Sequence, residues 1–217
     1  MRIVALKYGQ SVFGENYIFK GGRKDVLLPI SFTIYLIQTE GKNILVDAGC
    51  DDGAGFPMSV FKRPVEVLEE YGISADEITD VVLTHAHHDH VEGIRHYKNA
   101  VIHIQEAEYP KAKKYFPEDA RVQLFREECT IAESVTVKKI GGHTRGSSIV
   151  MAGRYVLCGD ECYHAKCLTE QICTGASKDE EKSTAFLAQY SKETYIPLLF
   201  HDPGIMPGRV GAMIVNP

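Results

Sequence analysis

The sequence has little that would suit a membrane or a nucleic-acid partner. No apolar run approaches the roughly 18 residues that a membrane-spanning helix needs. Residues 1–10 lack the sustained apolar stretch and the small-residue cleavage site of a secretory signal. The net charge is −5, without the basic character typical of nucleic-acid-binding domains. We therefore expect a cytoplasmic protein that acts on a small molecule, either as a monomer or as a homodimer.

The cysteines also lack the spacing of a structural zinc site. There are six, and four of them cluster in the second half of the chain, but no two form a Cys-x-x-Cys pair. These four are Cys158, Cys162, Cys167 and Cys173. In a protein without an export signal we expect reduced thiols. We interpret the cluster as small residues in the core or near the site, with a disulfide or a further metal there as the less favoured alternative.

The composition is that of an ordinary soluble domain, with 44% hydrophobic and 24% charged residues. Strand-like patterns occur at 3–6, 32–39, 43–46, 80–83, 101–104, 135–140, 148–151 and 155–157. Apolar residues recur at helical spacing at about 65–71, 106–114 and 183–190. Strands and helices alternate, and no repeat or linker divides the chain. We therefore predict one α/β domain over residues 1–217.

The densest group of chemically active residues is the segment THAHHDH at 84–90. Side chains two apart on an extended chain point the same way, so His85 and His87 can grip one metal ion. Asp89 and His90 follow where the chain turns into a helix, and they can face a second ion about 3.5–4 Å away. Imidazole and carboxylate ligands suit zinc, iron and manganese.

Three more candidate ligands each follow a strand-like stretch. His143 lies in GGHTRGSS, Asp160 in LCGDECY and His201 in LFHDPG. The ends of strands are where α/β proteins gather the residues of a site. We therefore expect these three side chains to complete a two-metal site with the segment 84–90.

The motif THAHHDHVEG resembles the HxHxDH signature of the metallo-β-lactamase superfamily. Asp47 in ILVDAG, His143, Asp160 and His201 match further motifs of that family in the same order, although Gly141 replaces the usual proline before His143. The resemblance extends over nearly the whole chain. It implies an αββα sandwich of mixed sheets with the metal site at one edge.

The resemblance also implies two metal ions bridged by Asp160. The other ligands would be His85, His87 and His143 for one ion, and Asp89, His90 and His201 for the other. Asp47 would hold a ligating histidine or the ligand loop in place. Zinc is the family's usual metal, with iron, manganese or cobalt in relatives. Two such ions lower the pKa of bound water to about 7 or below, so that a bridging hydroxide can attack a carbonyl.

Tyr163, three residues after Asp160, resembles a tyrosine of the metal-dependent N-acyl-homoserine lactonases. In that branch it hydrogen-bonds the substrate carbonyl or the ring-opening intermediate, and a phenol O–H aimed at a developing oxyanion stabilises it. The segments VIHIQEAEY and ISFTIYLIQTEGKNILVDAG are also similar to that branch. We therefore predict a hydrolase that opens lactones, with Asp89 and Tyr163 as its catalytic residues.

Other members of the superfamily remain as alternatives. The first is a glyoxalase II-like thioester hydrolase, which GGHTRGS fits well, although such enzymes usually carry an added helical domain. A β-lactamase is less favoured because of the extra ligand Asp89. A redox diiron protein usually replaces one histidine of the motif with glutamate, and a non-catalytic metal-binding module would have a broken ligand set. Two features depart from the lactonases, namely a short segment between Asp47 and the motif, and His88 where an aromatic residue is usual.

The remaining polar residues near these motifs receive structural interpretations. We expect His88 to be a packing residue or to lie at the rim of the site. We expect His96 and His164 at the surface, with His164 lining the pocket as the alternative. His103 alternates within a strand, so we expect it in the core. We interpret Glu161 as a surface carboxylate, with a position behind the metal ligands as the less favoured alternative.

Overall fold

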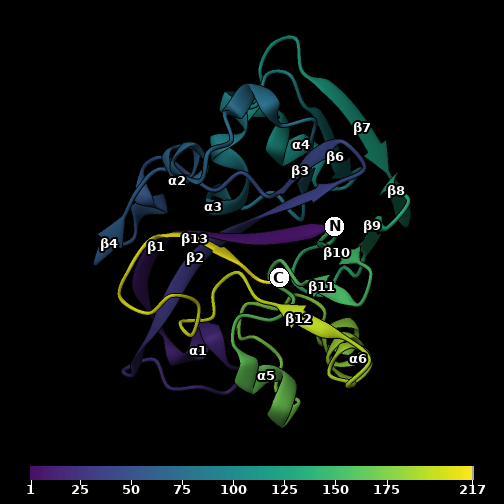
Figure 1. Ribbon diagram of the computed structural model, residues 1–217. Helices are drawn as coiled ribbons and strands as arrows, with labels where there is room; N and C mark the ends of the chain where they lie inside the picture. Colours follow the sequence, from purple (N-terminus) through teal and green to yellow (C-terminus); the bar gives the residue numbers. More distant parts are fainter. Residues whose placement is uncertain (217) are drawn as a thin grey trace.

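The computed structural model describes residues 1–216, and two β-sheets form its centre (Figure 1). The larger sheet has eight strands, seven of them in the order β13-β1-β2-β3-β5-β6-β7, with β4 paired to β1. Their bounds are β1 Arg2–Gly14, β2 Leu27–Thr39, β3 Lys42–Val46, β4 Val60–Phe61, β5 Asp80–Leu83, β6 Val101–Gln105, β7 Arg121–Phe125 and β13 Gly211–Ile214. Strands β1 to β3 are antiparallel, whereas β3, β5, β6 and β7 run parallel, so the sheet is mixed.

The smaller sheet has five strands in the order β12-β11-β10-β9-β8. They are β8 Glu128–Ala132, β9 Val135–Lys139, β10 Ser148–Ala152, β11 Tyr155–Leu157 and β12 Ile196–Leu198. The pairing is antiparallel except between β11 and β12, which run parallel. The helix α6 (Glu180–Tyr190) lies between β11 and β12 in the chain and is part of this parallel crossover.

Short helices cover the sheets. They are α1 Glu15–Ile18, α2 Pro64–Tyr71, α3 His88–Val91, α4 Tyr109–Ala112, α5 Ala165–Glu170 and α6 Glu180–Tyr190. Figure 1 shows α2, α3 and α4 together on one side of the larger sheet, and α6 beyond the smaller sheet. None of the helices formed by residues 1–216 combines the length and apolarity that crossing a membrane requires.

Alternating side chains explain how the layers hold together. One buried cluster joins Ile3 and Tyr35 of the larger sheet to Val137 and Leu157 of the smaller sheet, and it therefore lies between the sheets. The next residue along β1, Val4, belongs to a second cluster that also contains residues of α2 and α6. This two-residue period is typical of strands buried on both faces. The layer order helix, sheet, sheet, helix confirms the predicted αββα sandwich.

Most predicted elements form, but several differ. The helix expected at 106–114 is only the single turn α4 followed by a 3-10 turn at 113–115. Pro110 has no N–H and fits the first turn of a helix, so the helix begins there. Before it, the backbone N–H of Glu106 donates to Phe125 of β7 (3.0 Å). The sequence patterns did not predict β4, β7, β8, β13, α1 or α5.

The positions of the clustered cysteines agree with their interpretation as core residues. All six are free, and five of them, including the four of the cluster, are buried. They belong to the apolar clusters or contact backbone carbonyls, as Cys162 does with His164 O at 3.3 Å. His103 is also buried as predicted, and its Nε2 lies 2.8 Å from Asp80 Oδ1.

Candidate metal centre

The first group of candidate ligands lies where β5, β9 and β11 end. His85 and His87 follow β5, His143 follows β9, and Asp160 follows β11. One ligand atom from each of the four lies within 4.8 Å of the others. The Nδ1 atom of His87 is 2.9 Å from His85 Nε2 and 3.0 Å from His143 Nε2. Asp160 Oδ2 is 3.3 Å from His143 Nε2.

The second group contains Asp89 and His90 of α3 and His201, which follows β12. The His90 and His201 Nε2 atoms lie 3.6 and 3.7 Å from Asp89 Oδ2. The other oxygen of Asp160 reaches this group, since its Oδ1 is 3.1 Å from His90 Nε2 and 3.2 Å from His201 Nε2. Asp160 therefore directs one oxygen at each group.

The donor atoms of both groups fit divalent cations. In the first group three ring nitrogens converge at about hydrogen-bond distance, and burial lowers the pKa of His85 far below its usual range and that of His143 to about 4. Neutral imidazoles turn lone pairs toward this common point, where a cation would satisfy them. In the second group His90 Nε2 and Asp160 Oδ1 are buried and lie 3.1 Å apart, yet neither has a hydrogen-bond partner with good geometry among the described residues. Such orphaned donor atoms are the expected lining of a metal site.

The histidines are held from their outer ring nitrogens. Asp47, at the end of β3, lies 2.7 Å from His90 Nδ1 and accepts hydrogen bonds from the Thr84 N–H (2.7 Å) and hydroxyl (2.8 Å). The Thr84 hydroxyl is also 3.0 Å from His85 Nδ1, and Ser31 O is 2.9 Å from His201 Nδ1. Each contact leaves an Nε2 atom facing the centre, which is how outer partners orient metal-binding histidines.

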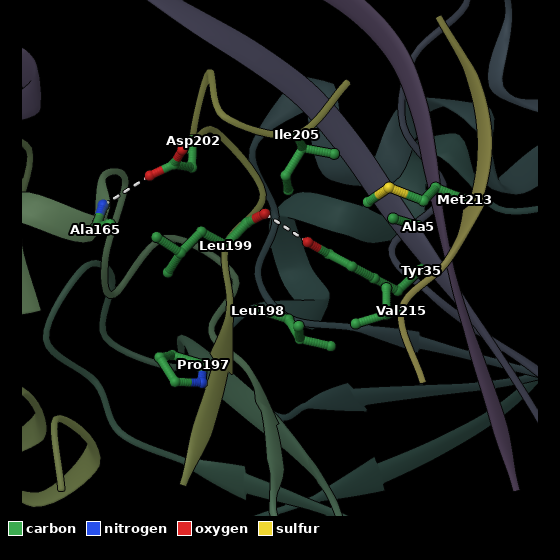
Figure 2. Close-up of a pocket in the computed structure, with 10 residues that line it drawn as sticks. All are labelled: Ala5, Tyr35, Ala165, Pro197, Leu198, Leu199, Asp202, Ile205, Met213 and Val215. Carbon is green, nitrogen blue, oxygen red and sulfur yellow. Dashed lines mark hydrogen bonds between the residues drawn. The ribbon is translucent and has the colours of Figure 1, made fainter. Parts of the chain in front are cut away.

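Two hydrogen bonds hold the segment 199–202, which carries His201, and both are drawn in Figure 2. The Tyr35 hydroxyl donates to Leu199 O (2.6 Å), and the Ala165 N–H donates to Asp202 Oδ2 (2.7 Å). Both bonds border an apolar cavity of about 240 Å³ between β12 and the strands β1, β2 and β13. None of the residues that line this cavity is a candidate metal ligand, so it lies apart from the centre.

Glu108 is a supporting residue of the centre that the sequence patterns did not predict. Its buried carboxylate accepts hydrogen bonds from the Ala86 N–H (3.1 Å), the Thr144 hydroxyl (2.8 Å) and the Gly146 N–H (2.8 Å). Ala86 stands between His85 and His87, and Thr144 follows His143. One carboxylate therefore fastens together the two loops that supply the histidines of the first group.

The prediction of Glu161 as a surface carboxylate is wrong. Its side chain is fully buried, and Oε1 accepts hydrogen bonds from the N–H groups of Gly142 (3.1 Å) and His143 (3.3 Å) and from the Ser147 hydroxyl. These donors belong to the loop GGHTRGSS, and they offset part of the cost of burial. Burial still raises the pKa of Glu161 to about 7.

Tyr163 lies at the edge of both groups. Its ring centroid is 4.9 Å from that of His201 and 6.0 Å from that of His143, and its side chain is buried. Burial, and then the neighbouring Asp160 carboxylate, raise the pKa of the phenol well above its usual value. Tyr163 is therefore a neutral O–H donor beside the candidate ligands.

The other predicted histidines lie outside the two groups. His88 is partly exposed at the rim, where its Nε2 is 2.8 Å from Asp52 Oδ1. His96 is partly exposed and lies 2.6 Å from an Asp51 oxygen. His164 caps α5, since its Nδ1 accepts from the Lys166 N–H (3.0 Å).

An apolar pocket adjoins the His201 side of the centre. It has a volume of about 350 Å³ and is lined by Val12, Phe13, Gly14, Tyr17 and Phe56. The ring of Phe13 is 4.5 Å from that of Phe56 and 6.4 Å from that of His201. Phe13 therefore neighbours the ring of His201 and also lines the pocket, although no candidate ligand lines the pocket itself.

Comparisons with known proteins agree with this geometry. A family profile described as the metallo-beta-lactamase superfamily matches residues 32–161, which is more than half of the chain. The chain is 30% identical over 139 residues to the N-acyl homoserine lactonase AiiB of Agrobacterium fabrum, covering 53% of this chain and 50% of that protein. It is 31% identical over 168 residues to a hydroxyacylglutathione hydrolase of Photobacterium profundum, covering 75% and 59%. The chain thus spans about half the length of the curated relatives it matches.

Solved structures share the fold at low identity. A quorum-quenching N-acyl homoserine lactone lactonase superposes with a TM-score of 0.84 at 20% identity, covering 98% of each chain. AidC, a dizinc quorum-quenching lactonase, superposes with a TM-score of 0.76 at 18% identity, covering 99% of this chain and 94% of that one. At these identities the likeness concerns the fold.

Proposed function

Because this chain belongs to the metallo-beta-lactamase superfamily, we propose that it is a dinuclear metal-dependent hydrolase that opens lactones. The observation that carries the proposal is the position of Asp160, which directs one carboxylate oxygen at His85 and His143 and the other at His90 and His201. A carboxylate shared between two groups of ligands suits a pair of ions bound side by side.

The ligands in this proposal are the seven side chains of the two groups. The first ion would bind His85, His87 and His143, the second would bind Asp89, His90 and His201, and Asp160 would join both. Two divalent ions, zinc in our proposal, would make water acidic enough to act as a nucleophile at neutral pH and would polarise the carbonyl. The support for zinc is the ligand chemistry and the fold shared with the dizinc lactonase AidC.

The side chains around the ions have separate tasks. Tyr163 would donate its O–H to the carbonyl oxygen as negative charge develops there. The Asp89 side chain is 15% exposed, whereas that of Asp160 is 2% exposed, so Asp89 is the carboxylate that an incoming substrate can reach. We propose that Asp89 would accept the proton released by the attacking water and pass it to the leaving alkoxide. Asp47 would orient His90.

The pocket beside His201 favours an acyl lactone as substrate. Its lining residues are uncharged, and Phe13, Tyr17 and Phe56 present aromatic surface. An apolar acyl chain would gain about 25 cal/mol for each Å² that it buries there. A glutathione thioester would instead bring charged groups into this pocket, and these need polar partners. The thioester hydrolase remains the second candidate, because the hydroxyacylglutathione hydrolase alignment covers 75% of the chain.

A substrate panel tests the proposal. The purified protein is loaded with zinc, and acid release is followed from N-acyl-homoserine lactones of increasing chain length, from hydroxyacyl thioesters of glutathione and from β-lactams. We expect lactone hydrolysis whose kcat/KM rises with chain length. Thioester hydrolysis without lactone hydrolysis would replace the first candidate with the second, and no hydrolysis of any of them would contradict both.

A further assignment rests on composition. We propose that the enzyme acts in the cytoplasm on a free small molecule, on the basis of its acidic charge and its six unpaired cysteines. Fractionation of cells that express the protein tests this location. For the assembly we propose a homodimer, which light scattering of the purified chain tests.

A further inference from the structure

A third group of metal-binding side chains lies at the rim of the centre. Cys50 and Asp52 belong to the loop that follows Asp47, and His88 is the first residue of α3. One ligand atom from each of the three lies within 4.8 Å of the others. None of these residues belongs to the two groups described above.

The ligand set has the chemistry of a zinc site. It offers one sulfur, one imidazole nitrogen and one carboxylate oxygen, which together suit zinc and cobalt better than magnesium or calcium. Ligand atoms around a tetrahedral zinc ion are about 3.3–3.8 Å apart, given bond lengths of about 2.0–2.3 Å. The His88 Nε2 and Asp52 Oδ1 atoms are 2.8 Å apart, and all three ligand atoms lie within 4.8 Å of one another. Binding therefore requires the side chains of His88 and Asp52 to move slightly apart. Three protein ligands leave a fourth position for water.

The surroundings hold His88 in the orientation that a ligand needs. The Tyr115 hydroxyl is 3.3 Å from His88 Nδ1, and the ring directs Nε2 at Asp52 Oδ1, 2.8 Å away. Without an ion, an Nε2–H group can donate to this carboxylate. A cation would take the place of that proton, and an Nδ1–H group would then donate a hydrogen bond to the Tyr115 hydroxyl, as is typical of metal-binding histidines.

One of the three residues is buried, and the other two are open to solvent. Cys50 is fully buried, and its sulfur lies 3.9 Å from the Tyr8 hydroxyl. The side chains of His88 and Asp52 are 35% and 65% exposed, so an ion can enter from solvent. The Tyr8 hydroxyl also donates to Asp89 O (2.8 Å), which places this site next to the second group of ligands.

We propose that Cys50, Asp52 and His88 form a third metal site, separate from the dinuclear centre, which takes zinc or a similar thiophilic divalent cation. The proposal does not depend on the reaction proposed above. Its distinctive feature is sulfur, because the two His/Asp groups contain none.

Cobalt substitution tests this site directly. The protein is freed of metal with a chelator and titrated with Co²⁺, while the near-ultraviolet thiolate-to-cobalt charge-transfer band and the metal content are recorded. We expect the band to appear in the wild type and to vanish in Cys50→Ser. Asp52→Asn should retain the band, but half-saturation should need about tenfold more cobalt, because one charged ligand is lost.

The matched control is Cys129→Ser. Cys129 is a partly exposed cysteine on β8, and its variant should keep the wild-type band. Absence of the band in the wild type, or a band of equal strength in Cys50→Ser, would overturn the proposal. Should Cys50→Ser fail to fold, by circular dichroism, an unchanged cobalt affinity in Asp52→Asn would overturn it instead. The cobalt bound to the His/Asp groups gives no such band, so this result is independent of the dinuclear centre.

Discussion

Glu108 offers the sharpest mutational test of how the centre is assembled. Its carboxylate is the common acceptor for donors in the loop after β5 and in the loop after β9, which carry all three histidines of the first group. In Glu108→Ala these donors lose their partner inside the protein. We expect both a less stable fold and a weaker hold on the first metal ion.

The size of the effect follows from the three hydrogen bonds. A hydrogen bond to a charged group contributes about 1.5–3 kcal/mol, and bonds within one network do not add fully. We therefore expect Glu108→Ala to lower the free energy of unfolding by about 3–5 kcal/mol. Freed loops should also weaken zinc binding by about 10–100-fold, the usual effect of losing an outer partner. Glu108→Gln keeps one acceptor oxygen, so its stability and its zinc affinity should lie between those of the wild type and of Glu108→Ala.

Two measurements check this prediction. Urea unfolding of the metal-free protein gives the stability, and competition with a chromophoric chelator gives the zinc affinity. The control is Glu106→Ala, because the Glu106 side chain is half exposed and pairs with the exposed Arg126 (3.1 Å). An exposed ion pair contributes about 1 kcal/mol or less. Equal stability and equal zinc affinity in Glu108→Ala and Glu106→Ala would show that Glu108 does not hold the two loops together.

Four other outcomes follow. Asp160→Ala should lose at least one of the two ions, by metal analysis, and all detectable lactone hydrolysis. Tyr163→Phe should keep its metal while kcat falls about 10–100-fold; an unchanged kcat would make Tyr163 a packing residue. Removal of metal with a chelator should abolish hydrolysis, and added zinc should restore it. Burial opposes ionisation of Asp80, but hydrogen bonds from His103, Thr79 and Lys42 lower its pKa from 3.8 to about 2. The contribution of Asp80 to stability is therefore present above about pH 4 and lost as the pH falls toward 2. Unfolding curves of Asp80→Asn should show about 2 kcal/mol less stability than the wild type at pH 7. The stability of this variant should also depend less on pH below pH 4.

The candidate ligands could be predicted because local signals mark them. His85 and His87 follow a buried strand, and His143, Asp160 and His201 each come soon after another one. Because β9, β11 and β12 run in the same direction, their carboxyl ends lie at one edge of the smaller sheet. Packing of the two sheets brings the end of β5, from the larger sheet, to the same place. The resemblance to the family then predicted which ligands would bind each of the two ions.

The supporting carboxylates could not be predicted, because their roles depend on contacts between distant segments. Glu108 meets the loop at Thr144 and Gly146, 36 and 38 residues further along the chain. Glu161 directly follows Asp160 and looks like a surface residue, yet it turns inward because the loop GGHTRGSS presents three donors to it. No local pattern distinguishes such a carboxylate from an exposed one.

The missed strands have a similar cause. The side chains of β7 and β13 are mostly exposed, and Leu124, Met213 and Ile214 are among the exposed large hydrophobic residues. The two strands lie at opposite ends of the strand order in the larger sheet. Their strand structure comes from pairing with β6 and β1, which sequence periodicity does not report.

The proposed reaction depends on two ions that share Asp160. Anomalous diffraction from crystals of the zinc-loaded protein, measured at the zinc absorption edge, locates these ions. We expect one peak in contact with His85, His87 and His143, and a second in contact with Asp89, His90 and His201, with Asp160 touching both. A single peak in this region after zinc loading, or two peaks of which Asp160 touches only one, would contradict it.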